Sequence, residues 1–224
     1  PTQMWQLRSR TVLNFYRHAH TPSVNTAALG FTDSLRQNAP DFYQGERQMK
    51  GTVHYETRDD IALLTIDNPP VNPLSSGVRQ GLDDGINAAL SDDNIKAIVL
   101  TGAGRAFIAG ADISEFGGKA EGPSLHDCLN TMDASSKPIV AAINGTAFGG
   151  GLAVALCCHY RVIAPSAPVG LPEVKLGLLP GAGGTQRLPR LIGAAKALDF
   201  MISGDPIPGP QAKALGIVDE VVEG

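Results

Sequence analysis

The sequence predicts an α/β domain with a largely parallel sheet, and two observations carry this prediction. From residue 51 onward, short apolar runs typical of strands alternate with longer segments of helical periodicity. Two of the apolar runs, at 95–100 and 138–143, are continuous rather than alternating, as in buried strands of parallel sheets. No sequence repeat of fixed period accompanies this alternation.

The expected elements follow one another regularly along the chain. Strands at 54–56 and 61–66 flank a polar turn and form a hairpin, which the proline-rich segment 68–73 ends. Apolar residues at Val78, Leu82 and Ile86 predict a helix over 78–90, with Ser75 or Ser76 as its N-cap. The other expected elements are strands at 95–100, 138–143, 160–164 and 168–169, and helices at 125–132, 151–158, 185–192 and 194–203.

The composition is that of a folded domain and excludes several classes of protein. The 224 residues are 43% hydrophobic and 18% charged, so the chain can bury a sizeable core. No apolar run approaches the roughly 20 residues of a membrane-spanning helix, and the net charge of −4 argues against a nucleic-acid-binding surface. The three cysteines, two of them adjacent at Cys157 and Cys158, do not form a disulfide framework. A reducing, cytoplasmic location is therefore expected.

Residues 1–50 differ from the rest and are interpreted as a basic N-terminal extension of unknown role. They carry six Lys/Arg and three Asp/Glu, a net charge of +3, which leaves −7 for residues 51–224. Residues 1–32 contain no acid, and their apolar residues are compatible with one short amphipathic helix. Such a segment is either a solvated or packed extension or an organelle transit segment, and the transit interpretation makes a mitochondrial location the alternative.

Glycine is concentrated after residue 51, where the usual glycine-loop motifs fail. The dinucleotide-loop pattern begins at Gly102 and at Gly181, but its last glycine position is occupied by Phe107 and Gln186. No segment fits a P-loop or the G-x-S-x-G motif of serine hydrolases. The adjacent residues Cys157, Cys158 and His159 lack the spacing of metal ligands, so no metal site is expected.

Two other glycine loops are expected at one edge of the sheet. Gly110 and Ala111 follow one buried strand, and the triple glycine 149–151 follows the next and opens a helix. Both loops then lie at the carboxyl edge of the sheet, where α/β proteins bind ligands. Backbone N–H groups in such loops are good donors to a developing oxyanion. The alternative, that these glycines only permit tight packing, remains open at this point.

Three segments resemble the crotonase (enoyl-CoA hydratase/isomerase) superfamily. They are RAFIAGADI at 105–113, INGTAFGGG at 143–151 and GLPEVKLGLLPGAGGTQR at 170–187. The resemblance covers residues 51–224, leaves out residues 1–50, and is closest to the hydratase half of multifunctional β-oxidation enzymes. It implies a crotonase-like spiral of ββα units, here without the C-terminal helices that close the acyl site and build the trimer in relatives. A homotrimer or hexamer, weakened by the short C-terminus, is the implied assembly.

The resemblance implies a site for an acyl-CoA thioester, with no cofactor other than the coenzyme A carried by the substrate. The backbone N–H groups of Ala111 and Gly150 would form an oxyanion hole, and Glu173 would act as the acid/base. The implied substrate-binding residues are Asn72, Pro73, Leu74, Ala109, Asp112, Ile113, Pro180 and Gly181. Ser114 stands where many relatives have a lysine that helps to hold the nucleotide, so weaker coenzyme A binding is expected.

Ala153 occupies the position of the second catalytic glutamate of the hydratases. Hydration needs one group to deprotonate a water and another to deliver a proton, whereas moving a double bond needs a single base. The sequence therefore favours an enoyl-CoA isomerase that uses Glu173. The alternatives are a trans-2-enoyl-CoA hydratase impaired by Ala153, and a non-catalytic coenzyme A-binding or assembly module. The nearest other acids, Asp112 and Glu115, lie away from the water in this family.

Overall fold

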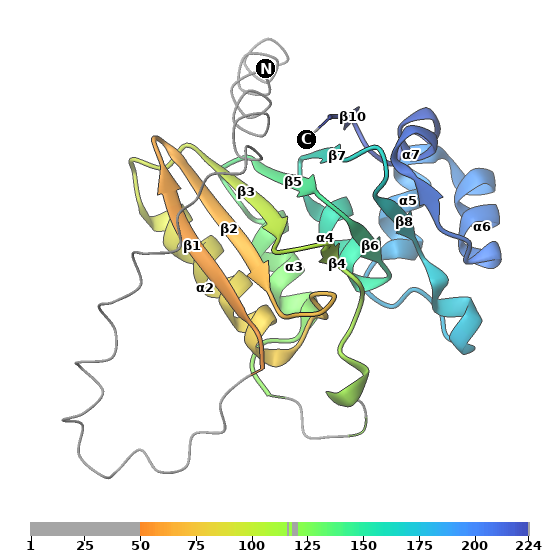
Figure 1. Ribbon diagram of the computed structural model, residues 1–224, viewed down its shortest axis with the longest axis horizontal. Helices are drawn as coiled ribbons and strands as arrows, with labels where there is room; N and C mark the ends of the chain where they lie inside the picture. Colours follow the sequence, from red (N-terminus) through yellow and green to blue (C-terminus); the bar gives the residue numbers. More distant parts are fainter. Residues whose placement is uncertain (1–49, 116, 118–120, 224) are drawn as a thin grey trace. The chain divides into compact units, whose positions relative to one another are not determined.

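Two β-sheets organise the described part of the chain. The computed structural model describes residues 50–115, 117 and 121–223, and residues Lys50–Glu223 cluster as one unit (Figure 1). The larger sheet has six strands in the order β1-β2-β3-β5-β7-β10, with bounds Thr52–Arg58, Ile61–Asp67, Ala97–Gly102, Ile139–Ile143, Tyr160–Ile163 and Glu220–Val221. The smaller sheet has the order β4-β6-β8-β9, with bounds Ala106–Ile108, Thr146–Phe148, Pro168–Gly170 and Ile207–Pro208.

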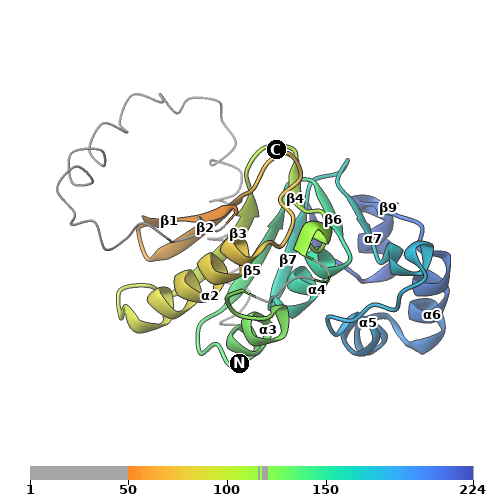
Figure 2. The same ribbon diagram turned by 90° about the horizontal axis from the view of Figure 1, so that it is seen from below.

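The larger sheet is mostly parallel, as predicted. Only the β1–β2 hairpin is antiparallel, and every other pairing in this sheet is parallel. All residues of β5 are buried, and β3 exposes only Thr101 in part, which explains their continuous apolar sequences. The helices α2 (Ser76–Ser91), α3 (Leu125–Asp133) and α4 (Gly150–Cys157) lie in a row along one face (Figure 2).

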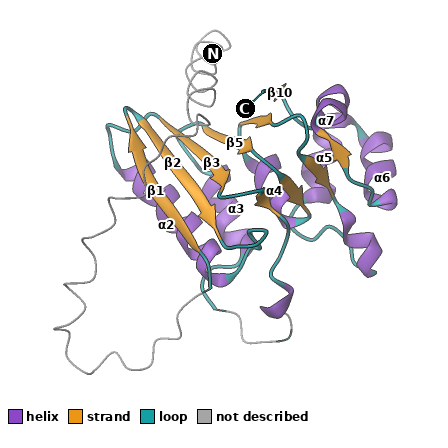
Figure 3. Cartoon of the chain, in the orientation of Figure 1, coloured by secondary structure: helices purple, strands orange, loops and turns teal. Residues whose placement is uncertain are grey.

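The chain order reveals a structural repeat of two strands and a helix. The units are β1-β2-α2, β3-β4-α3, β5-β6-α4 and β7-β8-α5, where α5 is Gly184–Ile192 (Figure 1). Figure 3 distinguishes the strands from the helices by colour. In the last three units the first strand joins the larger sheet and the second joins the smaller one. This is the predicted spiral of ββα units. The helices α6 (Ala194–Ser203) and α7 (Gly209–Leu215) follow, and two short 3₁₀ segments, η2 (Ile113–Glu115) and η3 (Pro172–Leu176), lie between the main elements.

Several expectations from the sequence need correction. The strands β4, β6, β9 and β10 were not expected, because segments of two or three residues are too short for a strand pattern to be recognised, and the seven-residue helix α7 was not expected either. The helix expected at 151–158 begins one residue earlier, at Gly150, and the strand expected at 95–100 lies at Ala97–Gly102. The two glycine loops therefore follow β4 and β6 of the smaller sheet, not the buried strands of the larger one.

One hydrophobic core connects the two sheets. The core joins both sheets, since Leu64, Leu100 and Ile143 of the larger sheet share one buried cluster with Ile108 and Val169 of the smaller. No helix in residues 50–115, 117 and 121–223 is long and apolar enough to cross a membrane. The extension 1–50 and its expected amphipathic helix fall almost wholly outside the described residues.

Candidate active site

The two glycine loops lie next to each other because β4 and β6 are parallel neighbours. Gly110 follows β4 with a φ of +116°, and Gly149 follows β6 with a φ of +52°, both in regions that favour glycine. A Cβ atom on Gly110 would lie 3.6 Å from the carbonyl oxygen of Phe148. The backbones of the two loops are therefore nearly in contact.

The start of α4 fits against β4 only because residue 151 is glycine. A Cβ atom there would lie 2.1 Å from the carbonyl oxygen of Ile108, far inside van der Waals contact. The N-terminus of α4 is thus held beside the loop that contains Ala111. This position brings the positive end of the helix to the carboxyl edge of the smaller sheet.

The backbone N–H groups of Ala111 and Gly150 remain available in these loops. Leu74 pairs with Ala111 in a short parallel bridge, in which the Leu74 N–H donates to the Gly110 carbonyl oxygen at 2.8 Å. Within the described part of the chain, neither the Ala111 nor the Gly150 N–H donates to an acceptor. Two unused donors on adjacent loops form a candidate oxyanion hole.

Glu173 lies beside the turn that leads into α4. The β6–β8 pairing brings the chain after Gly170 to this turn, and the Gly149 N–H donates to the Gly170 carbonyl oxygen at 2.9 Å. The Oε1 atom of Glu173 lies 3.2 Å from where a Cβ atom on Gly149 would be. Its Oε2 atom is buried and has no hydrogen-bond partner among the described residues, and burial raises the pKa of this carboxyl group.

Ala153 places a methyl group, and no carboxylate, in the first turns of α4. Its N–H donates to the Gly149 carbonyl oxygen at 2.9 Å, and the residue is 1% exposed. Any second acid for this site would have to come from elsewhere in the fold.

The two acids nearest in sequence to the Ala111 loop are already engaged. Asp112 accepts the Ser114 hydroxyl at 2.6 Å and the Lys50 ammonium at 3.0 Å. The Ser114 bond, with Lys50 and against burial, lowers the pKa of Asp112. Burial opposes ionisation of Glu115, but hydrogen bonds from Ser76 and Arg79 outweigh it and lower its pKa. Both side chains are thus ionised partners in local networks.

Three residues expected in the substrate site contact the chain around the two loops. They are Asn72, Pro73 and Leu74. Asn72 is buried, and its Nδ2 atom donates to the carbonyl oxygens of Ala103 at 2.9 Å and Ala106 at 2.8 Å. The Pro73 carbonyl oxygen accepts from Asn68 Nδ2 at 2.9 Å. Leu74 is also buried, and its Cδ1 atom lies 3.0 Å from where a Cβ atom on Gly150 would be. The side-chain polar atoms of Asn72 are therefore committed to the protein.

The other expected substrate-binding residues differ in exposure. Ile113 is 73% exposed and Gly181 is exposed, whereas Ala109 is partly buried and Pro180 is buried. Pro180 packs near Gly184 at the start of α5, and Gly184 also approaches Leu171, two residues before Glu173.

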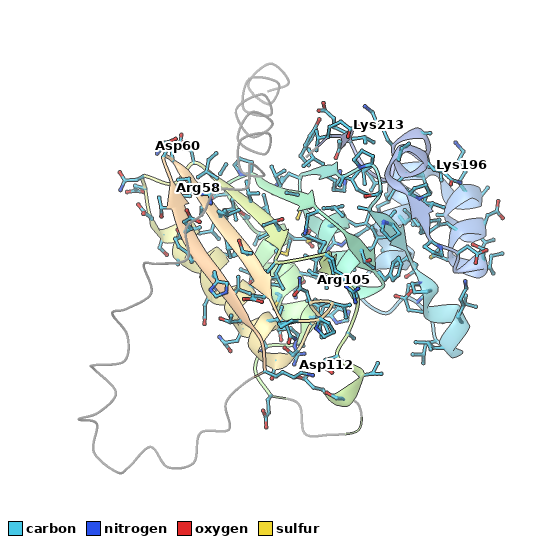
Figure 4. The ribbon with its side chains drawn as sticks, viewed as in Figure 1. Arg58, Asp60, Arg105, Asp112, Lys196 and Lys213 are labelled. Carbon is cyan, nitrogen blue, oxygen red and sulfur yellow. The ribbon has the colours of Figure 1, made fainter. Side chains whose placement is uncertain are left out.

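Figure 4 shows Asp112 at the opposite end of the β1–β2 hairpin from Arg58.

Sequence reasoning did not single out two basic residues that contact this region. Lys50 bonds to Asp112 across 62 positions, and Arg79 bonds to Glu115 across 36. No sequence pattern signals a pair so far apart. Only the fold brings these residues together.

The cysteines and the other candidate ligands do not form a metal centre in residues 50–115, 117 and 121–223. The thiols of Cys128, Cys157 and Cys158 are buried. Burial raises the pKa of Cys128 to about 11 and that of Cys157 to about 12, so these thiols stay protonated near neutral pH.

Comparison with known proteins finds relatives that are similar in sequence or in structure to most of this chain. The glyoxysomal fatty acid beta-oxidation multifunctional protein MFP-a of Cucumis sativus is 50% identical over 180 residues, which cover 76% of this chain and 25% of that protein. A probable enoyl-CoA hydratase of Bacillus subtilis is 45% identical over 165 residues, 70% of this chain and 64% of that protein. The crystal structure of an enoyl-CoA hydratase from Bacillus anthracis matches with a TM-score of 0.71 and 35% identity, over 78% of this chain and 70% of that one.

The match to the multifunctional relative is partial on both sides. The alignment covers 76% of this chain but about a quarter of the length of that protein. A family model described as enoyl-CoA hydratase/isomerase matches residues 56–223, which contain both glycine loops and Glu173. The chain belongs to the enoyl-CoA hydratase/isomerase family.

Proposed function

We propose that the chain moves the double bond of an enoyl-CoA between the β,γ and α,β positions. One observation carries the proposal: a single carboxylate without a hydrogen-bond partner for its Oε2 atom among the described residues, Glu173, lies beside adjacent loops with unused N–H donors. No second carboxylate stands at residue 153. A site with one base and two donors suits proton transfer next to a thioester.

The proposed reaction requires little beyond these groups. The thioester oxygen accepts hydrogen bonds from the Ala111 and Gly150 N–H groups. Glu173 removes a proton from Cα, the electrons move into an enolate, and the same carboxyl group returns a proton at Cγ as the double bond shifts. Each donor is expected to stabilise the enolate by about 3 kcal/mol, as single oxyanion-hole donors do elsewhere.

The raised pKa of Glu173 supports its role as the base. A carboxylate in a partly buried position is a stronger base than one in water, provided that it is ionised at the working pH. The activity is therefore expected to rise with pH through the raised pKa of Glu173 and then to level off.

A fatty acyl-CoA is the proposed substrate class. It is supported by the relative named for fatty acid β-oxidation and by the family of the chain. The homotrimer or hexamer and the cytoplasmic location, with its mitochondrial alternative, stay predictions.

An impaired trans-2-enoyl-CoA hydratase is the second candidate. It is favoured by the 45% identity to a protein named as a probable enoyl-CoA hydratase. Under this alternative, Glu173 works with a weaker second group, and hydration is faster than isomerisation.

The decisive assay supplies 3-enoyl-CoA and 2-enoyl-CoA separately and follows both products. Glu173→Gln is expected to lower kcat for isomerisation about 10³-fold, within the range lost when a general base is removed. Glu220→Gln in β10 is the matched control and is expected to keep the rate. Isomerisation that is unchanged by Glu173→Gln would disprove the proposal. If neither substrate turns over but coenzyme A raises the melting temperature, the chain is a non-catalytic binding module.

A further inference from the structure

Arg79 of α2 ties together three stretches of chain that surround the candidate oxyanion hole. Its Nη1 atom donates to the Leu74 carbonyl oxygen at 2.8 Å and to Glu115 Oε2 at 2.9 Å. Its Nε atom donates to the Pro123 carbonyl oxygen at 2.8 Å, and its Nη2 atom donates to that of Glu121 at 3.0 Å. The Arg79 side chain is 13% exposed, and three of its four bonds are partly buried, whereas the bond to Glu121 is exposed.

One branch of this network leads to the Ala111 donor. The Leu74 carbonyl oxygen is held by Arg79, and the Leu74 N–H donates to the Gly110 carbonyl oxygen at 2.8 Å. Leu74 therefore pairs with Ala111 in the isolated bridge while its carbonyl oxygen accepts a hydrogen bond from Arg79. Glu115, in η2 just beyond Ala111, anchors the other end of the same loop.

A second branch leads to the Gly150 donor. Pro123 stands just before the Ser124 cap of α3, so its bond to Arg79 links α2 to the start of α3. Leu125, the first residue of α3, has its Cδ2 atom 3.1 Å from where a Cβ atom on Gly150 would be. The Cδ1 atom of Leu74 lies 3.0 Å from the same Cβ position. The two side chains next to Gly150, Leu74 and Leu125, therefore belong to segments that are hydrogen-bonded to Arg79.

Glu115 in turn holds Arg79. Its Oε1 atom accepts the Ser76 N–H of the first turn of α2 at 2.7 Å, while Oε2 accepts from Arg79. The carboxylate joins the first residue of α2 to a residue one turn later and to η2. The planar guanidinium can serve four acceptors in different directions, which a lysine ammonium cannot do from one point.

We propose that Arg79, anchored by Glu115, is a positioning residue that sets the relative placement of the Ala111 and Gly150 N–H donors. The inference rests on the proposed function for its substrate, but it requires only that the protein bind a thioester. Donors that converge on one oxygen polarise the thioester carbonyl, and a displacement of either donor weakens that polarisation. Arg79 itself touches no substrate in this scheme.

The test measures the carbonyl stretching band of a bound 2-enoyl-CoA carrying ¹³C at the thioester carbonyl. In the wild-type protein this band is expected to move to lower frequency than in water. Arg79→Lys is expected to remove at least half of that movement and to lower kcat for isomerisation about 30-fold, with KM changed less than about threefold. Glu115→Gln leaves the three carbonyl bonds of Arg79 in place and is expected to show a smaller loss, about fivefold in kcat.

The Arg58–Glu56 pair on β1 supplies matched controls. Arg58 Nε donates to Glu56 Oε1 at 2.8 Å, and Arg58 lies far from Asp112 in Figure 4. Arg58→Lys and Glu56→Gln are expected to keep the carbonyl band and kcat. Melting curves establish that each variant is folded, and Glu115→Gln carries the test if Arg79→Lys does not fold.

The outcomes separate the two proposals. A carbonyl band that is the same in wild type, Arg79→Lys and Glu115→Gln overturns the positioning role, as does a wild-type band that is not shifted. A shifted wild-type band without turnover of 3-enoyl-CoA refutes the isomerase proposal and leaves the positioning role intact. Parallel losses in the Arg58 and Glu56 controls would also overturn it, because the effect would then be one of general stability.

Discussion

The two sheets of this chain differ in how completely they satisfy their own polar groups. In the six-stranded sheet, most strands have four to seven residues and their backbone groups pair along regular ladders. In the four-stranded sheet, the strands have two or three residues, and β4 and β6 are followed by the positive-φ glycines Gly110 and Gly149. At those ends, the described residues leave the N–H groups of Ala111 and Gly150 and one oxygen of Glu173 without partners.

This difference separates the part that stabilises the fold from the part that can bind. Of these three groups, the Oε2 atom of Glu173 is buried; a buried polar atom without a partner costs stability, so it persists only where the surrounding structure can bear the cost. The large sheet and its core supply that stability. At the ends of the small sheet, the Ala111 and Gly150 N–H groups and one oxygen of Glu173 stay without partners.

The largest effect is expected for Gly151→Ala. Its new methyl group would overlap the backbone of Ile108, which cannot yield as a flexible side chain does. We expect a loss of about 3 kcal/mol in the free energy of unfolding, at the upper end of overpacking effects, together with loss of activity. Urea unfolding measures it.

Gly104→Ala is the control for this change. Gly104 has a φ of +68° but no atom within 4 Å of its Cβ position, so only the backbone cost, about 1 kcal/mol, is expected. Equal losses in the two variants would show that the contact between α4 and β4 is not tight.

A pair of buried leucines compares the larger sheet with the surroundings of the candidate oxyanion hole. Leu64 in β2 and Leu74 beside Gly150 are both buried. Each substitution to alanine is expected to cost about 3 kcal/mol of stability. Leu64→Ala is expected to keep kcat within about twofold, whereas Leu74→Ala is expected to lower it at least about tenfold because it releases the Gly150 donor. Equal kcat values in the two folded variants would contradict the division between a stabilising sheet and the region around the Ala111 and Gly150 donors.

Asn72→Ala tests how the small sheet is supported. The change removes donors to the Ala103 and Ala106 carbonyl oxygens and an acceptor for the Asn68 N–H. We expect a loss of about 2 kcal/mol, measured by thermal unfolding, since buried polar groups would be left unpaired. Asn87→Ala on the exposed side of α2 is the control, and a similar loss there would remove the special role of Asn72.

The larger sheet could be predicted from sequence because its signals are local. The runs at 95–100 and 138–143 are long enough to read as buried strands, and Val78, Leu82 and Ile86 mark one face of a helix. The small sheet was not predicted because a strand such as Thr146–Phe148 is too short for an alternating pattern to be recognised. Its pairing depends on partners some 20 to 40 residues away.

The candidate site was predictable only in part. The positions of Ala111, Gly150 and Glu173 came from a family resemblance, and the fold explains them by the ends of β4, β6 and β8. The buried role of Asn72 and the bonds of Arg79 were not foreseen. Both depend on carbonyl groups whose directions a sequence does not contain.

The smallest effect concerns the stability cost of Glu173. Burial raises its pKa in the folded state, so the folded protein binds more protons than the unfolded chain between the ordinary and the raised pKa. Stability contributed by this group is therefore lost as pH rises through that window. Glu173→Gln is expected to be more stable than wild type by about 1 kcal/mol near pH 8, or roughly 3 °C in Tm.

At a pH below the ordinary pKa of glutamate, about 4, this difference is expected to vanish. Thermal melts at both pH values measure it, with Glu220→Gln as the reference. A variant that is less stable than wild type near pH 8 would show that the Glu173 carboxylate is well solvated or paired.

The ratio of isomerisation to hydration tests the central claim, that one carboxylate works at this site. The wild-type protein is expected to isomerise 3-enoyl-CoA at least about 100-fold faster than it hydrates 2-enoyl-CoA, because the second acid–base group is an alanine. Ala153→Glu is expected to raise hydration at least about tenfold. A wild-type protein that hydrates 2-enoyl-CoA as fast as it isomerises 3-enoyl-CoA would contradict the account.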